Sequence, residues 1–126
     1  MLSILDTSVL IAERPSAIDG DIGVSVVSIA ELQVGVLMAA DDDSRARRLA
    51  RLSAILRAFD PLPVDPAVAS SYGQLAAATA RAGRKASARS LDLMIAATAM
   101  AHGARLVTAN PGDMSHLGDH LEIVAA

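Results

Sequence analysis

Apolar and polar positions along the chain form blocks that predict short strands separated by helices. Residues 1–5 are mostly apolar and show no helical spacing, which is typical of a strand that is covered on both faces. Residues 22–27 (IGVSVV) are rich in β-branched side chains and predict a second strand. Between these two strands, residues 8–14 predict a short helix that ends at Pro15.

Two amphipathic helices are predicted next. Apolar side chains recur at helical spacing over residues 28–40, and a run of aspartates that begins at Asp41 ends this helix. Residues 44–59 predict the second helix, with its arginines exposed to solvent and its apolar side chains, including Leu49 and Leu56, facing inward.

The second half of the chain continues the alternation of helices and short strands. Asp65 followed by proline is typical of an N-cap with Pro at the first helical position, and Gly103 is typical of the residue that follows a helix. In chain order, the predicted elements are a strand over 62–64, a helix over 65–82, a basic loop over 83–89, a helix over 90–102, a strand over 104–108, a turn or short helix over 110–117 and a strand over 121–124.

The order of these elements predicts the fold class. Strands that alternate with helices favour an α/β fold with a central, mostly parallel sheet and helices on both faces. The length fits a single domain over residues 1–126. In sheets of this kind, ligands bind beyond the carboxyl ends of the strands, so candidate chemistry is sought there.

The composition narrows the possible functions. A chain that is 52% apolar can bury a core, and its net charge of −3 provides no overall basic field to attract nucleic acid. The absence of cysteine excludes disulfides and thiolate metal sites, and it fits the cytoplasmic location that we expect. With one Phe, one Tyr and no Trp, the chain lacks an aromatic platform for stacking single-stranded bases. We expect neither a signal peptide nor a membrane-spanning segment.

Acidic residues recur after strands and in the first turns of helices. Asp6 follows the first strand, Glu31 lies in the first turn of the helix that begins at Ser28, Asp92 lies in the first turn of the 90–102 helix, and Asp113 follows the 104–108 strand. Because the carboxyl ends of parallel strands meet at one edge, we expect these carboxylates to lie together. Like charges that are gathered in a partly dry cleft repel one another, and a hard divalent cation such as Mg²⁺ removes the conflict.

Each acid taken alone also has a structural explanation. Asp6 is a suitable N-cap for the first helix, and Ser28 with Glu31 forms the S-x-x-E pattern of a capping box. Asp92 is favoured in a first helical turn by the helix dipole, and Asp113 stands in a Pro-Gly turn. None of these explanations accounts for the joint pattern, in which all four acids are predicted at the same edge.

Three blocks of the sequence resemble a known family. LDTSVL, SIAELQVG and LDLMIAATAMAHGARLVTANPGDM are similar to the PIN domain, in particular to the VapC-type toxins of type II toxin–antitoxin systems. The resemblance implies a three-layer α/β/α sandwich and a Mg²⁺- or Mn²⁺-dependent endoribonuclease. The catalytic, metal-binding acids of the family then fall on four residues of this chain: Asp6, Glu31, Asp92 and Asp113.

Further expectations follow from the resemblance. Thr7 or Ser8, together with Thr108, match hydroxyl positions that support the metal site, and Asn110 stands where many relatives carry another Asp. The family implies an RNA substrate, a homodimer and a cognate VapB-like antitoxin. Apolar side chains of the 28–40 helix are candidates for contact with that antitoxin: Leu32, Val36, Leu37 and Met38.

Basic residues close to Asp92 in the sequence are candidates for contact with RNA phosphates. These are Arg81, Arg84, Lys85 and Arg89, whereas the arginines of the 44–59 helix are interpreted as a solvated face.

Other functions remain as alternatives. A PIN-like module with weak catalysis that acts mainly by binding a partner keeps the same fold. A phosphotransferase that uses Asp6 as nucleophile requires a second Asp two residues later, where this chain has Ser8. The chain has no GxxxxGK[ST] motif for a P-loop, and its histidines, His102, His116 and His120, do not suggest a serine–histidine triad.

Overall fold

The structure is a computed structural model that describes residues 1–12 and 18–126, so the predicted helix end at Pro15 lies outside the described residues. The alternation of strands and helices is confirmed. In chain order the elements are β1 (Leu2–Leu5), α1 (Thr7–Leu10), β2 (Asp21–Gly23), α2 (Val26–Leu37), α3 (Asp42–Ala58), α4 (Pro66–Arg81), the 3₁₀ helix η1 (Ala86–Arg89), α5 (Ser90–Ala101), β3 (Arg105–Thr108), the 3₁₀ helix η2 (Pro111–Leu117) and β4 (Ile123–Ala125).

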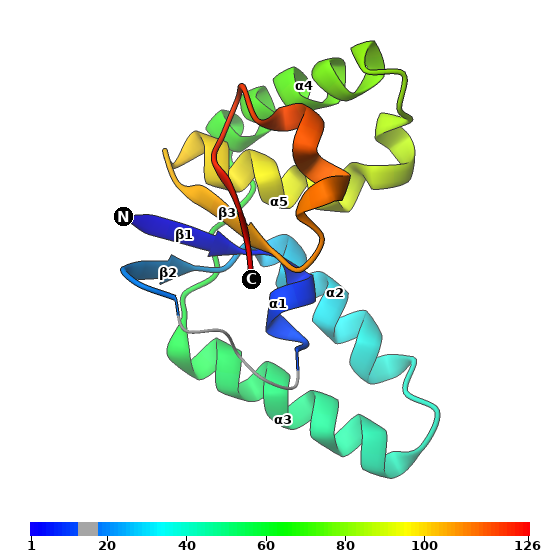
Figure 1. Ribbon diagram of the computed structural model, residues 1–126. Coiled ribbons are helices and arrows are strands. Elements are labelled where there is room, and N and C mark those ends of the chain that lie inside the picture. The colour runs from blue at the N-terminus through cyan, green and yellow to red at the C-terminus, as the bar shows by residue number, and fades with distance from the viewer. Residues whose placement is uncertain (13–17) are drawn as a thin grey trace.

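The described strands form one parallel sheet, in the order β2-β1-β3-β4. Ile4 of β1 pairs with Gly23 on one side and with Leu106 on the other, and Val107 pairs with Val124 at the β4 edge. The predicted parallel sheet is therefore confirmed. All strands point the same way, so their carboxyl ends share one edge, where α1, α2 and η2 begin (Figure 1).

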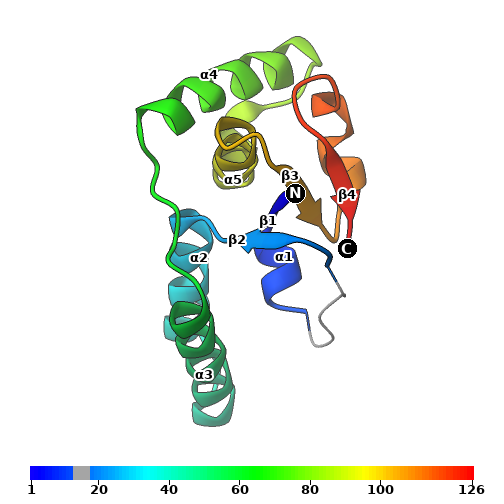
Figure 2. The same ribbon diagram turned by 90° about the vertical axis from the view of Figure 1, so that its left-hand side faces the viewer.

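Helices cover both faces of the sheet (Figure 2). On one face α5 lies against β1 and β3, with α4 outside it, and fully buried side chains such as Ile4, Leu93 and Leu106 fill the space between them. The alanines of α5 include Ala96 and Ala97, which are fully buried and too small to hold the helix away from the sheet. On the other face, Val9 of α1 packs against the sheet in a smaller cluster.

Helices α2 and α3 form a hairpin that extends beyond the sheet (Figures 1 and 2). The hairpin has its own small core, made of Val24, Leu32, Val36, Leu52 and Ile55. Asp41 caps α3 by accepting a hydrogen bond from the backbone N–H of Ser44 at 2.7 Å. Arg48 of α3 donates to the carbonyl of Gly35 in α2 at 2.6 Å, which ties the two helices together.

The predicted strand over 22–27 is wrong beyond Gly23. β2 ends there, and α2 begins at Val26, because the Ser25 hydroxyl accepts a hydrogen bond from the N–H of Val27 and caps the helix. The predicted strand over 62–64 is also wrong, since it is reduced to a single bridge between Ser25 and Leu62. The β-branched residues are therefore divided between a short strand and the first turn of a helix.

The sequence predicts more buried apolar side chains in the hairpin than the structure buries. Leu49 and Leu56 of α3, which the sequence predicts to face inward, are 49% and 46% exposed. Among the described elements, α3 packs mainly against α2, so only a narrow apolar stripe of each helix is covered. In the part of the chain that the structure describes, no helix has the length and apolar character needed to cross a membrane.

Candidate active site

The structure brings the predicted acids to one cavity at the carboxyl edge of the sheet. The cavity has a volume of about 220 Å³ and is lined by Asp6, Glu31, Asp92 and Asp113. Asp6 stands between β1 and α1, Glu31 on α2, Asp92 in the first turn of α5 and Asp113 in the first turn of η2. Residues far apart in the sequence thus meet because four elements begin or end at this edge.

Asp6 is held by two hydroxyl groups. Ser8 donates to Asp6 Oδ2 at 2.7 Å, and Thr108, at the end of β3, donates to the same oxygen at 3.0 Å. The backbone N–H groups of Ala109 and Asn110 donate in turn to the hydroxyls of Ser8 and Thr108. These backbone donors orient the hydroxyl protons toward Asp6. Although Asp6 occupies the N-cap position of α1, its side chain makes no capping hydrogen bond there.

Glu31 is positioned by Thr7 rather than by a helix cap. Thr7 donates to Glu31 Oε1 at 2.8 Å, and its hydroxyl also lies 2.9 Å from that of buried Ser28. The capping-box interpretation of Ser28 and Glu31 is wrong, because the cap of α2 is Ser25 and Glu31 lies beyond the first turn. Ser28 is buried and contacts the hydroxyl of Thr7 instead of capping a helix.

Asp113 is the most loosely held acid of the cavity. Its side chain is 62% exposed, and its carboxylate lies 4.0 Å from Arg89. Arg84 donates to the backbone carbonyl of Asp113 at 3.0 Å. Two of the predicted RNA-binding residues, Arg84 and Arg89, are thus brought to this side of the cavity. The side chains of Arg81 and Lys85 are exposed and make no hydrogen bond or ion pair with the described residues.

The electrostatics of the cavity show that the acids interact. Burial raises the pKa of Glu31, which the hydrogen bond from Thr7 lowers in part, and the negative charges of Asp92 and Asp6 raise it further. Burial also raises the pKa of Asp92, with the Asp6 charge adding to the effect and Arg89 opposing it. The carboxylates are therefore close enough to repel one another.

The donor set fits a hard divalent cation. The side chains provide carboxylate and hydroxyl oxygens, which Mg²⁺ and Mn²⁺ prefer, and no thiolate. Within residues 1–12 and 18–126, however, no three acidic or histidine side chains lie close enough together to enclose an ion. An ion bound here would therefore retain water molecules in its coordination sphere, as Mg²⁺ usually does.

Asn110, which the sequence analysis singled out, also lines the cavity, as does Met114. His116 connects η2 to α4. Its Nε2 lies 2.9 Å from the hydroxyl of Thr79, whose proton is donated to the carbonyl of Leu75. Burial, together with the charges of Arg84 and Arg89, lowers the pKa of His116, so the ring is neutral and packs as a structural side chain.

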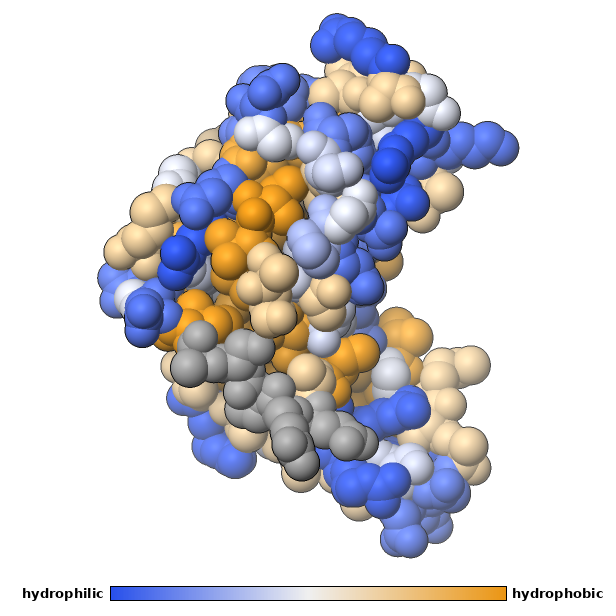
Figure 3. Space-filling model, in the orientation of Figure 1, coloured by the Kyte–Doolittle hydropathy of each residue, from blue (hydrophilic) through white to orange (hydrophobic). Residues whose placement is uncertain are grey.

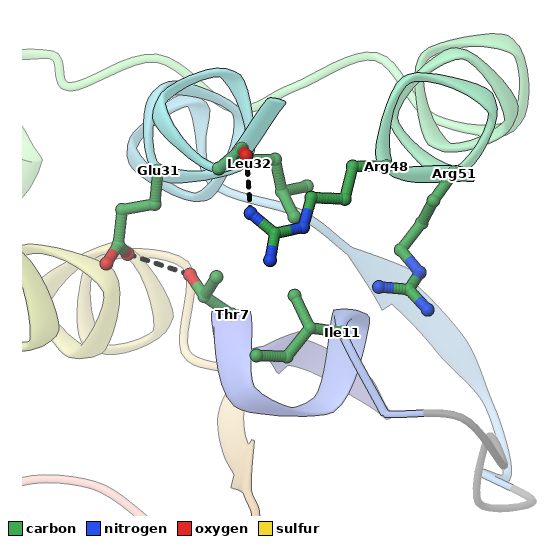
Figure 4. Close-up of a pocket in the computed structure, with 7 residues that line it drawn as sticks. Thr7, Ile11, Glu31, Leu32, Arg48 and Arg51 are labelled. Atoms are coloured by element: carbon green, nitrogen blue, oxygen red, sulfur yellow. Dashed lines mark hydrogen bonds between the residues drawn. The ribbon is translucent and has the colours of Figure 1, made fainter. Parts of the chain in front are cut away.

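A second cavity of about 460 Å³ adjoins the first one. It shares Thr7, Ile11 and Glu31 with the acidic cavity, and Arg48 and Arg51 of α3 line its far side (Figure 4). The sequence interpretation placed both arginines on a solvated face and missed this position. The sequence does hold one indication, since the i, i+3 spacing of the two arginines places them on the same side of α3.

The chain is similar to proteins of assigned function. A family model described as the PIN domain matches residues 3–119. Ribonuclease VapC8 of Mycobacterium tuberculosis is 40% identical over 102 residues, which are 78% of this chain and 90% of that protein. Ribonuclease VapC5 of the same species is 39% identical over 111 residues, which are 83% of this chain and 80% of that protein.

The backbone is also similar to a solved structure. The crystal structure of VapBC-5 from Mycobacterium tuberculosis, a member of the VapBC family of toxin–antitoxin systems, superposes with a TM-score of 0.88 at 38% identity. The superposition covers 99% of this chain and 98% of that chain. The similarity thus includes every element that contributes an acid to the cavity.

Proposed function

The chain belongs to the PIN-domain family, and from this premise we propose that it is a ribonuclease toxin of the VapC type. It hydrolyses RNA phosphodiester bonds as an endoribonuclease and is neutralised by a cognate antitoxin. The relatives named as VapC ribonucleases support the activity, and the VapBC-5 structure supports the toxin–antitoxin context. We take residues 1–126 as a single PIN domain.

One observation carries the proposal. Carboxylates from the β1–α1 junction, α2 and α5 line a single cavity at the carboxyl edge of a parallel sheet, and hydrogen bonds from hydroxyls fix two of them, Asp6 and Glu31. Carboxylates gathered in this way repel one another and lower the stability of the folded protein unless a cation neutralises them. We therefore infer that the cluster serves to bind a cation. We assign catalytic and metal-binding roles to Asp6, Glu31, Asp92 and Asp113.

The proposed cofactor is Mg²⁺ or Mn²⁺. A divalent ion in such a site supplies Lewis acidity and lowers the pKa of water, so that hydrolysis proceeds at neutral pH. Asp6 and Glu31 present carboxylate oxygens whose direction is set by Ser8, Thr108 and Thr7. Asp92 adds charge from the start of α5, and Asp113 completes the set from η2.

The predicted RNA contacts lie on the η1 side of the cavity. Arg84 and Arg89 contact Asp113, so their guanidinium groups border the place where we expect the scissile phosphate. Arg81 and Lys85 remain proposals for more distant phosphates. With few aromatic residues, selection of the RNA rests on its shape and loops rather than on base stacking.

The proposed partners are a VapB-like antitoxin and a second copy of the chain. Among the candidate contact residues, Leu37 and Met38 at the end of α2 are 66% and 75% exposed, whereas Leu32 and Val36 are buried in the hairpin core. The exposed pair is therefore the part of the prediction that we retain for antitoxin contact. The cytoplasmic location expected from the sequence stays a prediction.

The test is cleavage of total cellular RNA with added Mg²⁺ or Mn²⁺, compared with the same reaction in EDTA. We expect cleavage only with the ion, and products that carry 5′-phosphate and 3′-hydroxyl ends. Ends with a 2′,3′-cyclic phosphate would show that the 2′-hydroxyl, rather than water, is the nucleophile. Absence of cleavage under all ions, with binding of an antitoxin retained, would favour the alternative of a partner-binding module.

A further inference from the structure

The cavity beside the acidic site is lined with cationic side chains. Arg48 and Arg51 project into it from α3, opposite Ile11 of α1 and the Thr7–Glu31 pair (Figure 4). Arg48 gives one N–H to the carbonyl of Gly35, and this hydrogen bond fixes the position of its guanidinium group. A guanidinium carries five N–H donors, so most of those on Arg48 remain for a ligand.

The sign of the charge changes across Glu31. On one side of this residue lies the cavity with Asp6 and Asp92, and on the other side lies the cavity with Arg48 and Arg51. The two cavities share Thr7, Ile11 and Glu31, so they form one continuous depression. A ligand that extends from the first cavity into the second passes from a carboxylate environment to a guanidinium environment.

We infer that the Arg48–Arg51 cavity is a subsite for an RNA phosphate adjacent to the scissile one, an inference that rests on the proposed function. RNA carries one negative charge per nucleotide, so a phosphate held among the acids by a cation has a neighbouring phosphate close by. Guanidinium groups recognise phosphate oxygens in bidentate geometry. The volume of about 460 Å³ also admits the sugar or base attached to that phosphate.

The cationic cavity gives the site arginines on two sides. Arg84 and Arg89 contact Asp113 on the η1 side, and Arg48 and Arg51 lie beyond Glu31 on the α3 side. Figure 3 shows that this side of the molecule is hollowed between an upper and a lower part, with hydrophilic side chains on both. A single-stranded RNA that crosses this hollow passes arginine side chains both before and after it reaches the acids.

The test measures RNA binding by variants of α3. Each variant is made in an Asp6→Asn background to prevent cleavage, and its affinity for a labelled single-stranded RNA is measured over a series of salt concentrations. We expect Arg51→Gln to weaken binding about tenfold at low salt, as for a lost charged hydrogen bond. The slope of log affinity against log salt should also decrease by about 0.7, the value for one single-strand phosphate contact.

The matched control is Arg57→Gln, which makes the same change of charge on the same helix but outside both cavities. We expect its salt slope to equal that of the background protein. Arg48→Gln should resemble Arg51→Gln, but it also removes the hydrogen bond to Gly35, so thermal melting must accompany it. The side chain of Arg51 makes no hydrogen bond or ion pair with the described residues, so its variant is the cleaner test.

Equal salt slopes for Arg51→Gln and Arg57→Gln would overturn the subsite while leaving the ribonuclease proposal intact, provided that the wild-type chain cleaves RNA. Failure of the wild-type chain to bind or cleave any RNA would instead overturn the proposed function. If Arg51→Gln weakened only the complex with an acidic protein segment, the cavity would belong to a protein partner and the RNA subsite would be rejected.

Discussion

The two sides of the acidic cavity are built differently. On the sheet side, Asp6 receives two hydrogen bonds of 2.7 and 3.0 Å from Ser8 and Thr108, and Thr108 is buried. On the η2 side, Asp113 is 62% exposed and its carboxylate reaches Arg89 only at 4.0 Å. One acid is therefore fixed before any ligand binds, whereas the other can adjust to what binds.

The difference arises from the backbone around each acid. Asp6 follows β1, where its N–H donates to the carbonyl of Val107 and ties it to β3. The residues after β3 then supply the N–H groups that orient the Ser8 and Thr108 hydroxyls. Asp113 lies instead in a short 3₁₀ helix, whose hydrogen bonds are fewer and poorer in geometry. Preorganisation is thus concentrated at the sheet.

The largest expected effect comes from Asp6→Asn. The change keeps the volume of the side chain and removes the charge of the best-held acid among the proposed ligands, so RNA cleavage should fall on the order of a thousandfold. Thermal melting should show that the fold is retained. Initial rates of RNA cleavage in Mg²⁺ measure the effect, and cleavage at near wild-type rates would show that the ion binds elsewhere.

A smaller loss is expected from Thr108→Val, which keeps the shape of the side chain but removes the donor to Asp6 Oδ2. Groups that orient metal ligands typically contribute about 10- to 100-fold to metal affinity or activity, so we expect a loss in this range. Higher concentrations of Mg²⁺ should restore part of the activity, because the carboxylate itself is still present.

The control for this variant is Thr98→Val. Thr98 is also buried, and its hydroxyl donates to the carbonyl of Met94 within α5, away from the cavity. Both variants should lose stability by about 1 kcal/mol. Only Thr108→Val should lose cleavage, and equal losses for the two variants would show that the hydroxyl beside Asp6 has no specific role.

The positions of three of the acids, on both sides of the cavity, were predictable from the sequence. Asp6, Asp92 and Asp113 follow a strand or begin a helix in a pattern of alternating elements, and the parallel topology alone gathers such positions at one edge. Their appearance in one cavity agrees with that prediction. The assignment of catalytic and metal-binding roles to them stays a prediction.

The local setting of Glu31 was not predictable from its own segment. Both Ser25 and Ser28 precede residues with helical spacing, and each is a suitable N-cap by composition. The choice depends on distant contacts, since Leu62 pairs with Ser25 and Thr7 contacts Ser28. The spacing of Arg48 and Arg51 shows that they share one side of α3, but that this side faces a cavity depends on α1 lying opposite, which no pattern within α3 encodes.

Asp113→Asn should have a smaller effect than either change on the sheet side. An exposed side chain that is loosely held contributes less preorganisation to the proposed site, so we expect a loss of about tenfold or less in cleavage. Initial rates at saturating Mg²⁺ measure the effect. A loss as large as that of Asp6→Asn would contradict the distinction between the two sides.

The smallest expected effect is a gain in stability on removing one of the like charges. The pKa values of Glu31 and Asp92 are raised in the folded protein, by burial first and then by neighbouring acids. In the pH range between the ordinary and the raised pKa, the folded state binds more protons than the unfolded state, so stability falls as pH rises through that range. At neutral pH without metal, the wild-type protein carries this full destabilisation.

Asp92→Asn removes the contribution of Asp92 and part of the increase in the pKa of Glu31, so the metal-free variant should be more stable at pH 7. Because both carboxylates are partly solvated, the gain should be about 0.5 kcal/mol, or roughly 2 °C in melting temperature. Below about pH 3 the acids are protonated in both states and the gain should vanish. Asp60→Asn, an exposed change outside the cavity, serves as the control, and its melting temperature at pH 7 should stay close to that of the wild type.

Adding Mg²⁺ should reverse the order of stability, because an ion that binds only the folded state stabilises the protein with the stronger site. Melting curves at pH 7 with and without Mg²⁺ measure this reversal. A variant that stayed less stable than wild type in EDTA would show that Asp92 is held by favourable contacts rather than by enforced repulsion. In that case contacts within the protein would stabilise the carboxylates on both sides of the cavity, and their proximity would no longer be an argument for a bound cation.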